Sequence, residues 1–284
     1  MTEPGIERDV VYARAEGYWT SAPVGVKGTV LKLIPKSFRK RTLDLTMDIY
    51  KPAGHYQGQR PLLLIMHGGS FYVGHKEEAG QAAWCRHFAS LGYVAASINY
   101  RLGFLPFKSA LKKAELRAIE DADAALRYLL GREDLKVDPG RIFAAGTSAG
   151  AMTALSLAFR PKGAEKPRIR AVGAFWGSVH SLEVLDYAST PILSFQSVND
   201  PIMPYDKGYP FGAKLGAFQF LMALFSDKMY GTLAIHRRAT EKGMVSEHHP
   251  CQETGHRLHL DNEGNFTPRF FEIRDAMAAF FNKC

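Results

Sequence analysis

A glycine-rich pentapeptide, Gly-Thr-Ser-Ala-Gly at residues 146–150, constrains the fold of this chain more than any other stretch. It follows the apolar segment 141–145, which is typical of a short buried strand, and precedes 151–159, which is rich in helix formers and lacks proline. A strand, a G-x-S-x-G turn and a helix together predict a sharp turn that lifts the serine side chain clear of both elements. Ser148 is therefore a candidate nucleophile, and the backbone N–H of Ala149 is a candidate donor to a negatively charged oxygen.

Short apolar segments alternate with segments of helical periodicity along the rest of the chain. Helices are expected at 76–90 and 109–130, and Asp138-Pro-Gly140 predicts a turn. This alternation predicts an α/β fold, with a mostly parallel central sheet and helices on both of its faces. The segments with strand character are residues 43–50, 61–66, 93–99, 142–145, 171–176, 191–197 and 245–251.

The length and composition predict one large core. The chain has 284 residues, of which 46% are hydrophobic, and no repeat or linker-like stretch interrupts it. We expect a single domain over residues 1–284, with a small cap insertion at about 205–230. Three cysteines (Cys85, Cys251 and Cys284) do not make a disulfide framework and show no metal-ligand spacing, so reduced thiols are expected.

The net charge of +8 raises the question of an anionic partner. Much of the excess lies near the N-terminus, but no aromatic interleaving or nucleic-acid motif accompanies it, so we favour a solvated surface connection and expect no nucleic acid partner. Binding to an anionic surface, with incidental hydrolytic activity, is kept as an alternative. The basic residues concerned are Lys27, Lys32, Lys36, Arg39, Lys40 and Arg41.

The chain contains no apolar stretch of the roughly 18 residues needed to cross a bilayer, so integral membrane association is not expected. The first nine residues lack the pattern of a signal peptide, which predicts a cytoplasmic protein, unless a leader preceded residue 1 and directed secretion. Apolar surface could support a homodimer, whose interface the sequence does not locate.

His67-Gly-Gly-Ser70 directly follows the strand predicted at 61–66. The two adjacent glycines, Gly68 and Gly69, let backbone N–H groups turn toward a bound oxygen, so they are candidate oxyanion donors in addition to Ala149. A flexible turn is the alternative interpretation. We expect His67 to brace this loop through hydrogen bonds rather than to act as a base.

An orienting acid should follow a strand downstream of the serine. Asp200 stands at the end of the strand predicted at 191–197, ahead of Pro201; Asp186 and Asp206 compete with it but do not follow a strand so directly. The alternative role for Asp200 is to cap its own turn.

The base should lie after the next strand, and His256 occupies the loop that follows residues 245–251. Its imidazole is suited to moving a proton near neutral pH. His259 is the rival, whereas His248 and His249 fall inside the predicted strand. The order serine, aspartate, histidine is the order of the α/β-hydrolases.

With these motifs in place, the chain resembles the α/β-hydrolase superfamily, specifically the carboxylesterase branch with an HGG-type oxyanion loop, and looks most like bacterial feruloyl and acetyl-xylan esterase-type domains. The shared features run from about Leu43 to Phe281 and include residues 45–52, 67–71, 98–102, 138–150 and 199–205. Two positions depart from the pattern: Ser70 replaces a third glycine, and Ala151 replaces the glycine often found after Ser-Ala-Gly.

The resemblance implies a serine carboxylic ester hydrolase that needs no metal or organic cofactor and acts on small short-to-medium acyl, acetylated or feruloylated esters. Ser148 would be the nucleophile, His256 the base and Asp200 its orienting acid, with the N–H groups of Gly68, Gly69 and Ala149 as oxyanion donors. Ser70 and Phe71 are the expected substrate-binding residues of the loop.

The aromatic stretch 209–225 has no motif and predicts either a small cap over the serine or a core helix. In the first case Phe218 and Phe220 bind substrate. Two further alternatives concern function. The same three side chains, Ser148, Asp200 and His256, could hydrolyse amides or peptides, as formamidases and dipeptidyl-peptidase-like enzymes do. The fold could also serve as a non-catalytic binding protein, although such proteins usually lack one of these three side chains.

Overall fold

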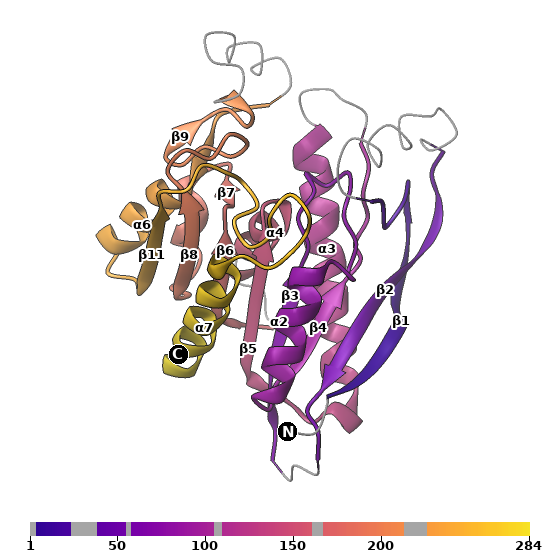
Figure 1. Cartoon of the computed structure of the whole chain (residues 1–284). Helices are drawn as coiled ribbons and strands as arrows, with labels where there is room; N and C mark the ends of the chain where they lie inside the picture. Colours follow the sequence, from indigo (N-terminus) through magenta and orange to yellow (C-terminus); the bar gives the residue numbers. More distant parts are fainter. Residues whose placement is uncertain (1–3, 24–38, 55–57, 105–109, 161–166, 213–225) are drawn as a thin grey trace.

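The apolar segments of the sequence form one central sheet in the computed structural model of this chain (Figure 1). The structure describes residues 4–23, 39–54, 58–104, 110–160, 167–212 and 226–284. Within these ranges, eight strands pair in the order β1-β2-β4-β3-β5-β6-β8-β11. The strands β1 and β2 are antiparallel to each other, and β2 is antiparallel to β4; every other neighbouring pair is parallel. The mostly parallel sheet predicted from the sequence is therefore confirmed.

The central strands are buried on both faces, as their continuous apolar sequences predict. Every residue of β4 is buried, and in β3 only the first residue is partly exposed. The strands of this sheet are β1 (Gly5–Gly17), β2 (Arg41–Lys51), β3 (Arg60–Met66), β4 (Val94–Ile98), β5 (Val137–Thr147), β6 (Ile169–Phe175), β8 (Ile192–Ser197) and β11 (Ser246–Cys251).

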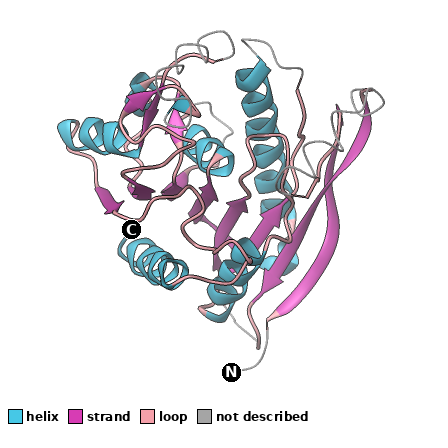
Figure 2. Ribbon diagram, turned by 45° about the horizontal axis from the view of Figure 1, so that its top comes forward, coloured by secondary structure: helices cyan, strands magenta, loops and turns pink. Residues whose placement is uncertain are grey.

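Helices cover both faces of the sheet (Figure 2). The apolar side chains of α2 (Ala79–Ser90) and α7 (Pro268–Lys283) pack into one core cluster, whereas those of α3 (Ala110–Gly131), α4 (Ala149–Ala158) and α6 (Thr232–Glu241) pack into the other. Small alanines at helical spacing on α3 are buried in the core. Three acidic residues of α3 are buried as well, and each is paired with a basic side chain: Glu115, Asp121 and Asp123. Short 3-10 turns occur at η2 (Glu133–Leu135) and η3 (Leu182–Asp186).

Two sequence expectations are corrected. The predicted turn at Asp138-Pro-Gly140 lies inside β5, where the pairing with β3 shifts register between Arg60 and Leu62, so the turn forms as an irregularity within the strand. Asp138 accepts a hydrogen bond from the N–H of Gly140 at 2.9 Å, which stabilises that local turn. In addition, α2 begins at Ala79 rather than at Lys76.

A second, three-stranded sheet stands at the end of the main sheet where β6 and β8 finish. It consists of β7 (Ser178–Val179), β10 (Met229–Gly231) and β9 (Lys207–Gly208), in that order. Its position matters because Met229 lines a pocket at Ser148.

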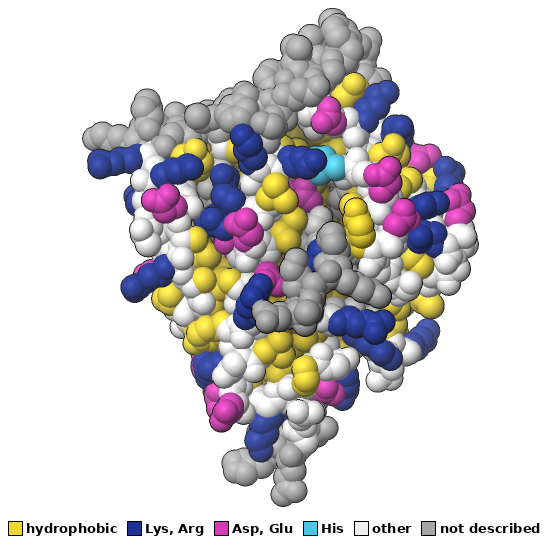
Figure 3. Space-filling model, turned by 180° about the vertical axis from the view of Figure 1, so that it is seen from behind, with side chains coloured by type: hydrophobic (Ala, Val, Ile, Leu, Met, Phe, Trp, Pro, Cys, Tyr) yellow, Lys and Arg dark blue, Asp and Glu magenta, His cyan; other side chains and the backbone are white. Residues whose placement is uncertain are grey.

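The composition raised one question about the surface charges and another about the cysteines. On the face shown in Figure 3, Lys and Arg side chains are interspersed with Asp and Glu side chains. Of the basic N-terminal residues, Lys27, Lys32 and Lys36 lie outside the described residues. No helix within the described ranges is both long and apolar enough to cross a membrane. Cys85, Cys251 and Cys284 are free thiols.

Candidate active site

Ser148 stands at the sharp turn between β5 and α4. Its backbone has φ 52° and ψ −118°, a conformation that non-glycine residues rarely adopt and that costs of order 1–3 kcal/mol. The turn is held at both ends, because the N–H of Ser148 donates to the carbonyl of Phe175 at 2.9 Å and its own carbonyl accepts from Met152 at 3.0 Å. The turn therefore presents the hydroxyl at the end of the sheet where the parallel strands finish.

A glycine at position 150 is required for this turn to sit close to β3. A Cβ atom added to Gly150 would lie 2.1 Å from the carbonyl oxygen of Met66, far inside van der Waals contact. The small residue lets α4 begin directly beside the loop that follows β3.

Ser148, His256 and Asp200 form one continuous chain of hydrogen bonds. His256 Nε2 lies 2.8 Å from Ser148 Oγ, and His256 Nδ1 lies 2.9 and 2.8 Å from the two carboxylate oxygens of Asp200. The structure thus brings together, from three distant segments, the three side chains that the sequence singled out. The carboxylate is fully buried and the imidazole is largely buried, with 14% of its side chain exposed.

Asp200 is held in place by further donors. Its Oδ1 accepts the backbone N–H groups of Ile202 at 2.8 Å and Met203 at 3.0 Å, and Oδ2 accepts Nε2 of Gln196 at 3.3 Å. A carboxylate fixed in this way orients the imidazole, with the Nδ1 proton directed at Asp200 and Nε2 free to accept from Ser148. Asp200 therefore caps its own turn and contacts the imidazole of His256 at the same time.

The other candidate acids lie at the surface. Asp186 pairs with Lys242 at 2.7 Å and with Arg238 at 3.1 Å, and Asp206 pairs with Arg237 at 2.9 Å. Neither contacts His256.

His259, the rival base, is enclosed in the core. Its ring stacks against Trp84 and packs against Trp176, with centroid distances of 5.5 and 5.1 Å, and neither ring nitrogen has a hydrogen-bond partner among the described residues. Burial, followed by the charges of Arg257 and His256, lowers the pKa of His259 to about 3. It is placed to pack rather than to exchange protons.

His67 braces the loop after β3. Nδ1 donates to the carbonyl of Gly68 at 2.7 Å, the ring stacks on Tyr100 at 4.4 Å, and the Tyr100 hydroxyl donates to the His67 carbonyl at 2.6 Å. Burial lowers the pKa of His67 to about 4. A neutral, fully buried imidazole fits a bracing role.

The remaining histidines singled out in the sequence lie on β11. His248 lies within hydrogen-bond distance of Ser194 and Tyr205, and His249 stacks on Phe195 with ring centroids 4.1 Å apart.

The loop after β3 packs against the serine turn. A Cβ atom added to Gly68 would lie 3.1 Å from the carbonyl oxygen of Thr147 and 3.3 Å from Ser148 Cβ. The carbonyl of Gly69 accepts the N–H groups of Tyr72 at 2.9 Å and Val73 at 3.0 Å, which closes the loop into a tight turn. None of the hydrogen bonds found within the described ranges uses the N–H of Gly68, Gly69 or Ala149.

A fully buried side chain on α2 links these two segments, and no sequence motif pointed to it. Gln81 donates from Nε2 to Thr147 Oγ1 at 3.0 Å, and Thr147 immediately precedes Ser148. Because Thr147 also contacts the position of Gly68, this hydrogen bond helps to fix the distance between the loop and the serine turn.

The ammonium group of Lys76 anchors the far end of the loop. Its Nζ lies 2.6 Å from Asp48 Oδ1, 3.0 Å from Asp9 Oδ1 and 3.0 Å from Glu77 Oε1. These three carboxylates have the spacing of a possible metal site, and the ammonium group lies among them. Burial opposes the charge, but the hydrogen bonds to the carboxylates outweigh it and raise the pKa of Lys76 to about 12.

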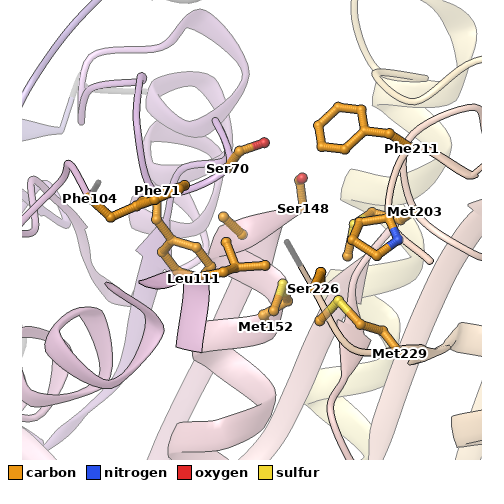
Figure 4. A pocket seen from close by; sticks show the side chains of 12 residues that line it. Ser70, Phe71, Phe104, Leu111, Ser148, Met152, Met203, Phe211, Ser226 and Met229 are labelled. Carbon is orange, nitrogen blue, oxygen red and sulfur yellow. The ribbon is translucent and has the colours of Figure 1, made fainter. Parts of the chain in front are cut away.

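An apolar pocket opens beside Ser148 (Figure 4). Ser70 and Phe71, the two loop residues expected to bind substrate, line it, as do Pro210 and Phe211 from the aromatic stretch. Phe218 and Phe220 lie outside the described residues.

Comparisons with known proteins agree with the fold. A family model described as BD-FAE matches residues 47–168. Gut esterase 1 of Caenorhabditis elegans is 31% identical over 121 residues, and carboxylesterase 3B of Mus musculus is 34% identical over 122 residues; each alignment covers 41% of this chain. The chain spans about a fifth of the length of these curated relatives, 21% in each case.

The solved structures cover more of the chain. Esterase 2 of Thermogutta terrifontis with propionate bound superposes with a TM-score of 0.62 at 19% identity, over 93% of this chain and 94% of that one. The same enzyme phosphoramylated by tabun gives a TM-score of 0.63, also at 19% identity, over 85% and 90% of the two chains. With the strand order and the serine turn described above, the chain has the α/β-hydrolase fold and is similar to esterases of that fold.

Proposed function

We propose that this chain is a serine carboxylic ester hydrolase that works through an acyl-enzyme, with Ser148, His256 and Asp200 as its catalytic residues. The observation that supports the proposal most strongly is the unbroken contact from Ser148 Oγ through the imidazole to a buried carboxylate. The esterase-type relatives and the fold support it independently.

The first half of the reaction forms the acyl-enzyme. His256 Nε2 removes the proton of Ser148 as Oγ attacks the ester carbonyl carbon, and Asp200 stabilises the imidazolium that results. The carbonyl oxygen becomes negatively charged and accepts hydrogen bonds from the N–H groups of Gly68, Gly69 and Ala149. The C–O bond to the alcohol then breaks, and the alcohol leaves with the proton from His256.

The second half releases the acid. Water gives a proton to His256 and attacks the acyl carbon, and the same N–H groups stabilise the second tetrahedral intermediate. The bond to Ser148 Oγ then breaks, and Oγ recovers its proton from His256.

The decisive experiment is a burst assay with p-nitrophenyl butyrate. The native protein should release about one nitrophenolate per chain in a fast phase, and Ser148→Ala should abolish both the burst and the turnover. Ser156→Ala is the matched control on the same helix, because Ser156 hydrogen-bonds Glu115 and does not line the pocket. Turnover that survives Ser148→Ala, or a fluorophosphonate probe that labels another residue, contradicts the proposal.

The substrate in this proposal is a small ester. Aryl formamides and short peptides form a second arm of the assay, since amides that outpace esters would identify an amidase with the same residues. The homodimer, the single domain over 1–284 with its cap at about 205–230 and the compartment stay predictions. Light scattering tests the first of these.

A further inference from the structure

The pocket beside Ser148 has a defined size and chemistry. Its volume is about 150 Å³, and its walls are almost wholly apolar. Figure 4 shows Ser148 with apolar side chains gathered around and below it. The residues that matter for its shape are Phe71, Leu111, Met152, Met203, Phe211 and Met229.

A cavity of this volume accommodates one compact group. An engineered apolar cavity of about 150 Å³ in another protein binds benzene, so the pocket matches a phenyl ring or a chain of roughly four to six carbons. A long fatty chain does not fit within it.

Met152 lines the pocket one helical turn after Ser148, and Figure 4 shows its side chain below that of Ser148. It is the fourth residue after Ser148, and its N–H donates to the Ser148 carbonyl at 3.0 Å. Side chains on a helix point back toward its N-terminus, so the Met152 side chain points toward the serine turn. The side chain is 2% exposed and belongs to the larger core cluster, which limits how far it can move.

Met229 contributes a second wall, from the small sheet rather than from the helix. It lies on β10, is fully buried, and its sulfur lies 3.6 Å from Ser178 Oγ on the neighbouring strand. Two unbranched side chains from different elements therefore bound the space next to Ser148 Oγ.

The pocket lies on the acyl side of the reaction. Ser148 and Ala149 line it, whereas His256 is not among its lining residues. In the reaction proposed above, the acyl group stays bonded to Ser148 Oγ, while the alcohol leaves with the proton of His256 and must therefore lie next to that imidazole. The group that occupies this pocket is accordingly the one that remains on the serine.

We propose, on the basis of the proposed function, that this pocket holds the acyl group, that the preferred substrates are esters of compact apolar acids from butanoic to hexanoic or benzoic acid, and that Met152 and Met229 set the upper limit of acyl length.

The first test is a series of p-nitrophenyl esters from acetate to dodecanoate, with the benzoate included. Each methylene buried in the pocket should raise kcat/KM about fourfold, until the pocket is full near hexanoate. Decanoate should then fall at least tenfold below the optimum, and benzoate should be turned over. A flat profile, or an optimum at decanoate or beyond, overturns the proposal.

Two variants and a control test the role of the methionines. Met152→Ala and Met229→Ala each remove three heavy atoms from a wall and should move the optimum to esters about two to three carbons longer, with kcat/KM for acetate little changed. Met277→Ala is the matched control, because Met277 is equally buried but lies in the core cluster on the opposite face of the sheet. Unchanged profiles in both folded variants, or the same shift in the control, overturn the proposal.

A binding assay separates this inference from the proposed function. Alkyl and phenyl boronic acids add to an activated serine without any ester being cleaved, and their binding is measured by the shift in melting temperature. One outcome is that no ester is turned over, that phenyl and butyl boronic acids bind, and that Met152→Ala binds longer alkyl boronic acids than the native protein does. The pocket inference then stands and the ester proposal fails. If esters are cleaved through Ser148 with no dependence on acyl length, the reverse holds.

Discussion

Replacing Asp200 with Asn should reverse the hydrogen bond between His256 and Ser148. In the native chain, the carboxylate accepts from His256 Nδ1, which leaves Nε2 to accept the serine proton at 2.8 Å. An Asn side chain will keep its oxygen toward the N–H groups of Ile202 and Met203, since those buried donors need an acceptor. Its NH₂ group then takes the place of Oδ2, the carboxylate oxygen nearer to Nδ1 at 2.8 Å, and can only donate, so the imidazole proton moves to Nε2.

The size of the effect follows from this change of tautomer. The imidazole can no longer accept from Ser148, and the same substitution in a chymotrypsin-type enzyme lowers kcat by about 10⁴, equal to about 5 kcal/mol of transition-state stabilisation. The fold should persist, because Asn has the shape of Asp and keeps two of the three accompanying hydrogen bonds.

The assay is kcat/KM for p-nitrophenyl butyrate at about pH 7, with circular dichroism to confirm folding. Asp206→Asn is the matched control: that carboxylate lies further downstream of β8 and pairs with Arg237 at the surface, so its loss should change the rate less than about twofold. An Asp200→Asn variant that keeps more than a tenth of the native rate would refute the reasoning.

Three further outcomes are expected. Gly68→Ala should lower kcat about 10²-fold, because the added methyl group crowds Ser148 and displaces an N–H donor. Gly131→Ala is the control and should leave kcat unchanged, because open space surrounds Gly131. Equal kcat values in both variants would argue against Gly68 as an oxyanion donor. Asp48→Asn should cost about 3 kcal/mol or more in urea unfolding, since it removes the closest partner of buried Lys76; a loss below about 1 kcal/mol would contradict the buried pair. His259→Phe should flatten the fall of stability with acid. The pKa of His259 in the folded chain, about 3, lies below the unfolded value near 6.5. The stability that the neutral ring provides is therefore fully present above pH 6.5 and falls by about 1.4 kcal/mol per pH unit as the pH drops toward 3. Identical slopes of unfolding free energy against pH for the variant and the native protein would disprove this.

The main sheet was predictable because its strands are continuous apolar runs. The run at 61–66 became β3, the run at 191–197 became β8, and the helical periodicity at 109–130 became α3, each within a residue or two. The order of Ser148, Asp200 and His256 also followed from strand ends, because parallel strands finish at one edge of a sheet.

Other features lacked a local pattern. The strands β7 and β9 have two residues each, too few for any periodicity, and β1 is an edge strand whose charged residues hide its alternation. The choice between His256 and His259 rested on loop position alone, and what separates the two residues is the stacking of His259 with Trp84 and Trp176, which only the packed chain reveals. Gln81 likewise has no signature in the sequence.

The ion pairs of Lys76 tie the first hairpin to the segment that carries Gly68 and Gly69. Asp9 lies on β1 and Asp48 on β2, whereas Lys76 lies in the segment between β3 and α2 that starts at His67. A chain shortened past Asp9 would therefore lose one counterion of an ammonium group whose side chain is only 2% exposed. Protein engineers who trim or fuse this end should monitor turnover as well as solubility.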